Sequence, residues 1–210
     1  MEINYKNFLT YTHTLYQTDK AYDDSQADRL ARHRHLEPDS AEFLASFVIS
    51  KNVKNVLEIG TSTGYSTLWI AYALHQINAQ PQDPSASLTS IDIDEWRLLT
   101  ARNHLRTLRL EDAVTLQQVD AKDFLHQSNE RYDMIFLDAE RKFYGEYVAD
   151  LKRLMRFGDV LVVDNVVSHA DEVVDFLAEF QQDDSYLCST LPIGAGLFIA
   201  VKQNYTNPKI

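Results

Sequence analysis

The fold is decided by the stretch Val56-Leu57-Glu58-Ile59-Gly60-Thr61-Ser62-Thr63-Gly64-Tyr65-Ser66. It opens with a mostly apolar run that predicts a strand, and a helix is predicted from about Tyr65 to Gln76. Gly60 and Gly64 bracket the turn between them, and because glycine lacks a Cβ atom, the backbone there can approach a ligand closely. The spacing differs from the dinucleotide motif G-x-G-x-x-G, and the Lys-Ser/Thr of a Walker loop is missing. Taken alone, the glycines also fit a plain tight turn between a strand and a helix.

The same alternation of apolar runs and amphipathic stretches continues along the chain. Further strands are predicted at 88–92, 114–119, 134–137 and 160–163, with helices at about 95–108, 122–126, 144–155 and 170–180. Such a pattern indicates a parallel sheet covered on both faces. The last two runs, 186–191 and 197–202, are joined by a short turn and predict an antiparallel hairpin. We therefore expect an α/β fold with a Rossmann-like, doubly wound, mostly parallel seven-stranded sheet and a C-terminal antiparallel hairpin.

The chain of 210 residues is expected to divide near Pro38. Residues 1–37 are polar and rich in tyrosine, and they predict an N-terminal helical extension that covers the site or mediates dimerisation. Residues 38–210 carry the strand–helix alternation and predict one α/β domain. Pro38 itself begins a predicted helix, since proline is favoured in the first helical turn.

Composition narrows the classes of partner. The 20 Lys and Arg against 31 Asp and Glu give a formal net charge of −11, which disfavours nucleic acid and anionic membranes as partners. The single cysteine, Cys188, excludes an internal disulfide and a multi-cysteine zinc site. No signal peptide or membrane-spanning run is visible, so a cytoplasmic location is expected. The basic cluster 29–35 is either a steering surface for an anionic substrate, a solvated face or a dimer contact.

An acid follows the second predicted strand. Asp92 lies 32 residues beyond Gly60, at a strand end where a carboxylate can hold two ribose hydroxyls by charge-assisted hydrogen bonds. A glycine turn followed by an acid at the next strand end is a nucleoside-binding arrangement without a phosphate cradle.

Oxygen-bearing side chains also follow the fourth and fifth predicted strands. Asp138 ends one, and Asp164 and Asn165 end the other. If these strands are adjacent and parallel, the three side chains form an all-oxygen set suited to a hard divalent ion, above all Mg²⁺. The alternative is that each strand-end acid only caps the following helix.

With these motifs in order, the sequence resembles the class I S-adenosylmethionine-dependent methyltransferases, and more narrowly the cation-dependent O-methyltransferases that include catechol and caffeoyl-CoA O-methyltransferases. The resemblance extends from about His35 to Lys202. It implies S-adenosylmethionine as the cofactor, with Asp92 at the ribose and with Asp120 and Ala121 at the adenine. The other residues that it implies for cofactor binding are Glu58, Gly60, Thr61, Ser62, Gly64, Tyr65, Ser66 and Asp138.

The resemblance also implies a catalytic group of Asp138, Arg141, Asp164 and Asn165, in which Asp138, Asp164 and Asn165 bind the divalent cation. Such an ion acts as a Lewis acid and a template, because it lowers the pKa of a hydroxyl and fixes its position. One position departs from the family, which commonly carries a lysine where this chain has Arg141. A guanidinium stays protonated and cannot act as a general base. We therefore interpret Arg141 as an orienting or anion-binding group.

The sequence thus predicts an S-adenosylmethionine-dependent O-methyltransferase that acts on a hydroxyl of a small phenolic or catechol-like acceptor, as a homodimer. One alternative is methylation of a hydroxylated uridine in tRNA, which a basic stripe containing Arg32, Arg34, Arg141 and Lys142 would favour. The other is a non-catalytic S-adenosylmethionine-binding module. The retained Asp138, Asp164 and Asn165 argue against that module, because a pure binder has no need of a metal site.

Overall fold

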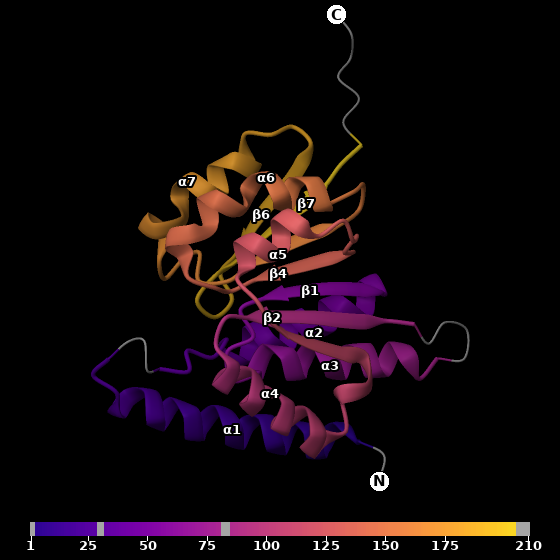
Figure 1. The fold of residues 1–210 in the computed structure, drawn as a ribbon, viewed down its shortest axis with the longest axis vertical. Helices are drawn as coiled ribbons and strands as arrows, with labels where there is room; N and C mark the ends of the chain where they lie inside the picture. The colour runs from indigo at the N-terminus through magenta and orange to yellow at the C-terminus, as the bar shows by residue number, and fades with distance from the viewer. Residues whose placement is uncertain (1–2, 29–31, 81–84, 205–210) are drawn as a thin grey trace, which may run out of the picture.

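A computed structural model describes residues 3–28, 32–80 and 85–204 of the chain. Its strands are β1 (Asn55–Ile59), β2 (Ser87–Asp92), β3 (Val114–Gln118), β4 (Met134–Leu137), β5 (Val160–Val163), β6 (Tyr186–Leu191) and β7 (Leu197–Lys202). They form one seven-stranded sheet in the order β3-β2-β1-β4-β5-β7-β6 (Figure 1). The strands β1 to β5 run parallel to one another, whereas β7 is antiparallel to both β5 and β6. The predicted fold class, including the C-terminal hairpin, is confirmed.

The register of the sheet brings the strand ends together. Ile59, the last residue of β1, lies opposite Ile91 in β2 and Leu137 in β4. Leu137 in turn pairs with Val163, the last residue of β5. The residues that follow these four strands therefore emerge at the same edge of the sheet.

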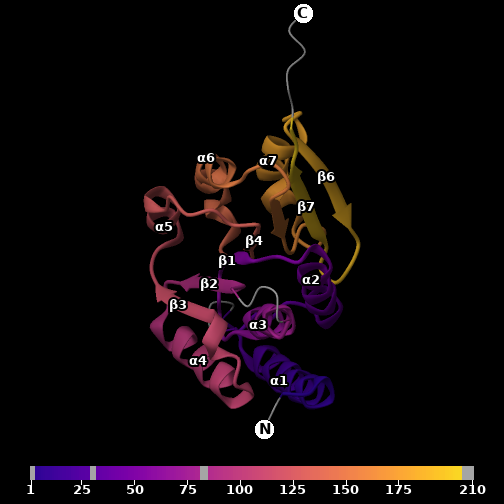
Figure 2. The same cartoon turned by 90° about the vertical axis from the view of Figure 1, so that its right-hand side faces the viewer.

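Helices cover both faces of the sheet, as the near-continuous apolar strands predict. They are α1 (Tyr5–Ser25), α2 (Pro38–Lys51), α3 (Tyr65–Asn78), α4 (Glu95–Leu108), α5 (Ala121–Gln127), α6 (Tyr144–Leu154) and α7 (Ala170–Gln181). Figure 2 shows α1, α3 and α4 on one side of the strands and α5, α6 and α7 on the other. Successive residues of a strand point to opposite faces of the sheet. Val56 therefore packs in the core on the side of α1, α3 and α4, and Leu57 packs in the core on the side of α5, α6 and α7.

Element boundaries follow from local capping. Asp94 accepts the backbone N–H of Trp96 at 2.9 Å, which begins α4 at the predicted residue. Asp120 accepts the N–H of Lys122 at 2.8 Å in the same way and begins α5 at Ala121, one residue earlier than predicted. The predicted third strand ends one residue early, at Gln118, and α6 ends at Leu154.

The N-terminal helix packs on the outer side of α3. The Phe8 ring stacks on Tyr72 with centroids 4.2 Å apart and meets Trp69 edge-on at 4.9 Å. These residues belong to one apolar core shared with α2, so the division at residue 37 stays a prediction. None of the helices in the described part of the chain combines the length and apolar character needed to cross a bilayer. The proline- and serine-rich stretch 80–87 predicts an exposed loop, of which residues 81–84 lie outside the described residues.

Gly60 fixes how closely β1 and β4 approach each other beyond their last paired residues. Its φ angle is +101°, and a Cβ atom added there would lie 2.0 Å from the carbonyl oxygen of Asp138. Only glycine fits both the left-handed backbone and the contact. Packing of the fold therefore requires glycine at position 60, whether or not a ligand approaches the turn.

We predict that Gly60→Ala lowers the free energy of unfolding by about 2–4 kcal/mol, because it combines an unfavourable backbone conformation with a clash against rigid backbone. The matched control is Gly145→Ala in α6, where an added Cβ meets nothing within 4 Å. That change should be neutral or stabilise the protein by roughly 0.5–1 kcal/mol. Urea denaturation followed by circular dichroism measures both, and equal midpoints for the two variants would contradict this account of the turn.

Candidate active site

A cavity of about 660 Å³ opens at the edge of the sheet where the carboxyl ends of β1, β2 and β4 meet. It lies where open α/β sheets ordinarily bind their ligands. Residues from the turns after these strands line it, together with the segment 32–35 that follows α1. The predicted site residues among its lining are Gly60, Ser62, Asp92, Asp120, Ala121, Asp138, Arg141 and Asn165.

The carboxylate of Asp92 joins the glycine turn to the end of β2. One of its oxygens accepts the backbone N–H of Ser62 at 2.8 Å, and the other accepts that of Asp94 at 3.0 Å. Ser62 itself has a left-handed backbone, with φ at +48°. The acid and the turn that the sequence singled out are thus held together at the cavity wall.

The remaining predicted cofactor residues lie beneath the turn and are absent from the cavity lining. Glu58 is fully buried, and its carboxylate accepts hydrogen bonds from the hydroxyls of Ser66, Thr67 and Ser90 at 2.5–2.6 Å. Burial raises the pKa of Glu58 to about 7, although the three hydroxyl donors oppose this shift. Thr61, Gly64 and Tyr65 are buried as well. In the structure these residues support the turn, and their contact with a cofactor stays a prediction.

The predicted oxygen set converges. The Asn165 amide donates to Asp138 Oδ1 at 3.0 Å and to Asp164 Oδ2 at 2.9 Å, and Asn165 has a left-handed backbone with φ at +66°. Asp164 is 2% exposed, and its Oδ1 is a buried oxygen without a hydrogen-bond partner among the described residues. The adjacency of β4 and β5 therefore brings these side chains together, as the sequence predicts.

Burial and mutual repulsion disfavour the charged forms of the two acids in this set. Burial raises the pKa of Asp138, although the positive charges of Arg34 and Arg141 oppose the shift. Burial, followed by repulsion from Asp138, raises the pKa of Asp164 further. Two close carboxylates with an unsatisfied oxygen fit a hard divalent cation, which would favour their charged forms.

Arg141 is buried beside these acids, in a short 3₁₀ turn at Arg141–Phe143. Its Nε lies 2.8 Å from Glu172 Oε2, at the start of α7. The neighbouring Lys142 points to the ring of Phe143, with Nζ 4.8 Å from the centroid, and is absent from the cavity lining. The geometry agrees with the interpretation of Arg141 as an orienting cation.

The segment 32–35 is the part of the cavity wall that no motif indicated. Arg34 forms a 2.7 Å ion pair with Glu140, which links this segment to the loop after β4. His33 and His35 line the cavity from the same segment. The only sequence signal was the basic cluster at 29–35, of which residues 29–31 lie outside the described residues.

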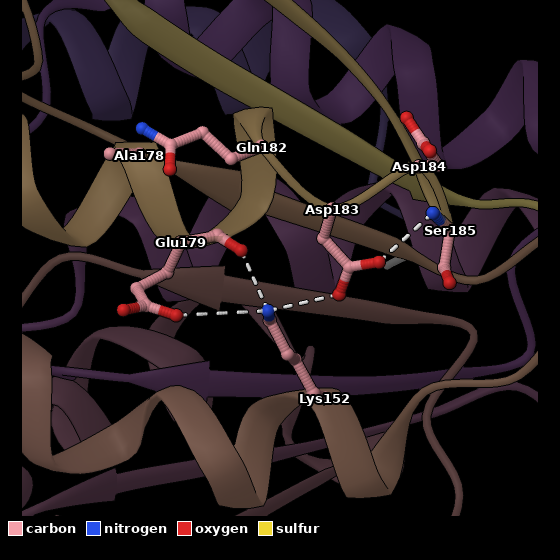
Figure 3. Close-up of a pocket in the computed structure, with 7 residues that line it drawn as sticks. All are labelled: Lys152, Ala178, Glu179, Gln182, Asp183, Asp184 and Ser185. Carbon is pink, nitrogen blue, oxygen red and sulfur yellow. Dashed lines mark hydrogen bonds and ion pairs between the residues drawn. The ribbon is translucent and has the colours of Figure 1, made fainter.

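A second hollow, of about 440 Å³, lies between α6, α7 and the loop 182–185 that leads to β6 (Figure 3). Its central cation, Lys152, donates to the Glu179 carbonyl at 2.6 Å and to the Asp183 carboxylate at 3.0 Å. The charge of Lys152 is therefore compensated within the chain, and the hollow contains none of the predicted site residues. We place the candidate active site in the first cavity.

The chain is similar to known O-methyltransferases. The profile of the O-methyltransferase family matches residues 20–203. A catechol O-methyltransferase of Niastella koreensis is 32% identical over 136 residues, which are 63% of this chain and 58% of that protein. A caffeoyl-CoA O-methyltransferase of Populus kitakamiensis is 29% identical over 149 residues, 67% of this chain and 60% of that protein. The chain thus spans about three fifths of the length of these relatives.

Solved structures share the fold. The crystal structure of an O-methyltransferase from Bacillus cereus in complex with SAH superposes with a TM-score of 0.75. The two sequences are 23% identical, and the superposition covers 92% of this chain and 91% of that chain. At this identity the likeness establishes the fold alone.

We predict that Asp164→Asn stabilises the metal-free protein at alkaline pH. Because the folded-state pKa of Asp164 lies above the unfolded value of about 3.9, its ionisation as the pH rises destabilises the folded state. In EDTA at pH 8.5 the variant should melt about 3–6 °C above the wild type, since 1 kcal/mol shifts the Tm of a domain of this size by about 2–4 °C. The difference should shrink towards pH 5, where the wild-type group regains its proton.

The control for this measurement is Asp184→Asn, at an exposed acid far from the cavity lining. It should leave the Tm unchanged at both pH values. A lower Tm for Asp164→Asn at pH 8.5 would show that the second carboxylate is compensated within the chain and needs no cation.

Proposed function

The chain belongs to the O-methyltransferase family, and we propose that it transfers the methyl group of S-adenosylmethionine to a hydroxyl of a small phenolic or catechol-like acceptor, assisted by a divalent cation. One observation carries the proposal: Asp138, Asp164 and Asn165 converge beside the same cavity that Asp92 lines. The acid proposed to bind the ribose and the oxygen atoms proposed to bind the cation thus lie at the same cavity. The relatives named catechol and caffeoyl-CoA O-methyltransferase support a phenolic hydroxyl as the acceptor.

The cofactor would be held by the glycine turn and the neighbouring strand ends. When bound, S-adenosylmethionine supplies a methyl group that its sulfonium already activates, so the main task of the chain is to align an oxygen nucleophile. Asp92 uses two of the roughly four acceptor sites of a carboxylate for backbone N–H groups. The others are available to ribose hydroxyls. Asp120 and Ala121 line the cavity at the start of α5 and would contact the adenine ring.

The cation would be held by Asp138, Asp164 and the amide oxygen of Asn165. When bound, Mg²⁺ supplies Lewis acidity that lowers the pKa of an acceptor hydroxyl and fixes its position. Asp164 Oδ1, buried and without a hydrogen-bond partner among the described residues, is the atom that most needs such an ion.

Arg141 positions charge and does not accept the proton. Its guanidinium is held by Glu172 and lowers the pKa of Asp138 against the effect of burial. Together with the charge of Arg34, it favours the carboxylate form of Asp138, which a cation would need. Since a guanidinium does not deprotonate in proteins, the proton of the acceptor hydroxyl leaves by another route.

Methylation of tRNA is the weaker candidate. It calls for a basic stripe that includes Arg34 and Arg141, but Arg34 is paired with Glu140 and Arg141 with Glu172. The net charge of −11 further weakens attraction to a phosphate backbone. The non-catalytic module is disfavoured because it gives no reason for the converging carboxylates. The homodimer and the cytoplasmic location stay predictions.

The proposal predicts methyl transfer that depends on a divalent cation. Purified protein, incubated with labelled S-adenosylmethionine and a panel of catechols, should label the acceptor in Mg²⁺ and lose the activity in EDTA. Bulk tRNA serves as the competing acceptor in the same assay. Transfer to tRNA alone would move the assignment to the second candidate, and transfer that persists in EDTA would remove the cation from the mechanism.

The cation and cofactor roles are separated by Asp164→Ala. We expect kcat to fall at least 100-fold, while calorimetry finds the Kd of S-adenosylmethionine changed by no more than about threefold. Such a split follows if Asp164 serves the reacting hydroxyl and Asp92 the cofactor. Asp184→Ala, at an exposed acid, should keep both values. An equal loss of cofactor binding in Asp164→Ala would contradict the division of roles.

A further inference from the structure

A second group of ligand-type side chains lies where α1 meets the segment that follows it. Asp19 belongs to α1, and His33 and His35 belong to the stretch leading to α2. Asp19 Oδ2 lies 3.1 Å from His33 Nδ1 and 3.0 Å from His35 Nε2. One ligand atom from each residue falls within 4.8 Å of the others. Two imidazoles therefore lie against the same carboxylate oxygen, Asp19 Oδ2.

The group is shielded from solvent. The side chains of Asp19, His33 and His35 are 12%, 13% and 4% exposed. Aromatic rings cover the two imidazoles: Tyr22 stacks on His33 at 4.6 Å, and Tyr65 stacks on His35 at 5.0 Å. A carboxylate in such surroundings requires a positive partner to offset its lost hydration.

One ring nitrogen of each histidine is buried and has no hydrogen-bond partner among the described residues. His33 Nδ1 is buried and makes no hydrogen bond to a described residue, although the Asp19 oxygen is only 3.1 Å away. In His35 the nitrogen beside Asp19 is Nε2, which also lies 2.6 Å from the Thr63 hydroxyl, and the unpartnered Nδ1 is the other nitrogen of the ring. Buried polar atoms are nearly always partnered. A close nitrogen–oxygen contact without hydrogen-bond geometry is what results when both atoms point at a third one.

The backbone of the segment is fixed by a different acid. Asp23 accepts the N–H of His33 at 2.6 Å and that of Arg34 at 2.8 Å. Asp23 thus satisfies backbone N–H groups of the segment, whereas the carboxylate of Asp19 faces the imidazole side chains.

We propose that Asp19, His33 and His35 bind a divalent transition-metal ion of the Zn²⁺ type, at a site distinct from that of Asp138, Asp164 and Asn165. Imidazole nitrogens suit Zn²⁺, whereas Mg²⁺ prefers oxygen ligands. In a tetrahedral zinc site with bonds of about 2.0–2.1 Å, neighbouring ligand atoms lie roughly 3.3 Å apart. The observed contacts of 3.0 and 3.1 Å need little adjustment to reach that spacing.

An ion at this place joins α1 to the cavity wall. His33 and His35 line the cavity, and Asp19 anchors them to the helix. Three protein ligands leave a fourth position for water or for the hydroxyl of Thr63, which lies 2.6 Å from His35 Nε2. The site would hold the segment over the cavity and stabilise the protein, without any part in methyl transfer.

The test is Zn²⁺ binding by the chelator-treated full chain, measured by calorimetry in excess Mg²⁺ and without cofactor or acceptor. We expect one Zn²⁺ per chain, with an affinity that falls at least tenfold in His33→Gln and in His35→Gln. Two controls should match the wild type: His13→Gln, at an exposed histidine of the helix that carries Asp19, and Asp184→Asn, at an exposed acid outside both ligand sets. Since no methyl transfer is measured, the result is independent of the proposed enzymatic function.

A second measurement uses the wild-type protein, so that it does not depend on the variants being folded. X-ray absorption at the zinc edge should show two imidazole nitrogens at about 2.0 Å. Absence of stoichiometric binding, unchanged affinity in folded His33→Gln and His35→Gln, or an all-oxygen zinc shell would each overturn the proposal. The Asp19 cluster would then be a hydrogen-bonded strut between α1 and the cavity wall.

Discussion

The close contact of Gly60 with the carbonyl of Asp138 is the constraint on which the site depends. Beyond this contact, the N–H of Gly60 donates to Ile91 at 3.0 Å, and the N–H of Asp138 donates to Ile59 at 3.0 Å. These contacts hold the carboxyl ends of β1, β2 and β4 beside one another. Asp92, the glycine turn and the proposed oxygen ligands lie at one cavity because the strands that precede them end at the same edge of the sheet.

Most of the fold could be predicted because its strands are short apolar runs separated by helices with clear caps. The position of the hairpin could not, since periodicity does not identify pairing partners. The structure inserts β7 beside β5 and leaves β6 at the edge. Burial explains the order: Phe198 in β7 is fully buried, whereas Leu187 in β6 is 64% exposed. The more apolar strand takes the interior place, and the more polar one tolerates the edge.

The site residues that directly follow strands could be predicted from the sequence. Those that a distant segment brings to the cavity by folding back could not. Asp138, Asp164 and Asn165 follow adjacent strands, so their convergence follows from topology. The resemblance implies Glu58 as a cofactor contact, and that contact stays a prediction, since in the structure three hydroxyls enclose the Glu58 carboxylate in the core. The contact of Asp19 with His33 depends on how the segment after α1 folds back, which no spacing rule indicates.

The central claim is that one cavity holds a nucleoside cofactor and a divalent cation side by side. A crystal structure grown with S-adenosylhomocysteine and Mn²⁺, with anomalous diffraction at the manganese edge, tests it most directly. We expect the ribose at Asp92 and one strong anomalous peak among Asp138, Asp164 and Asn165. A nucleoside bound elsewhere, or manganese absent from these ligands while the ribose occupies its place, would contradict the account.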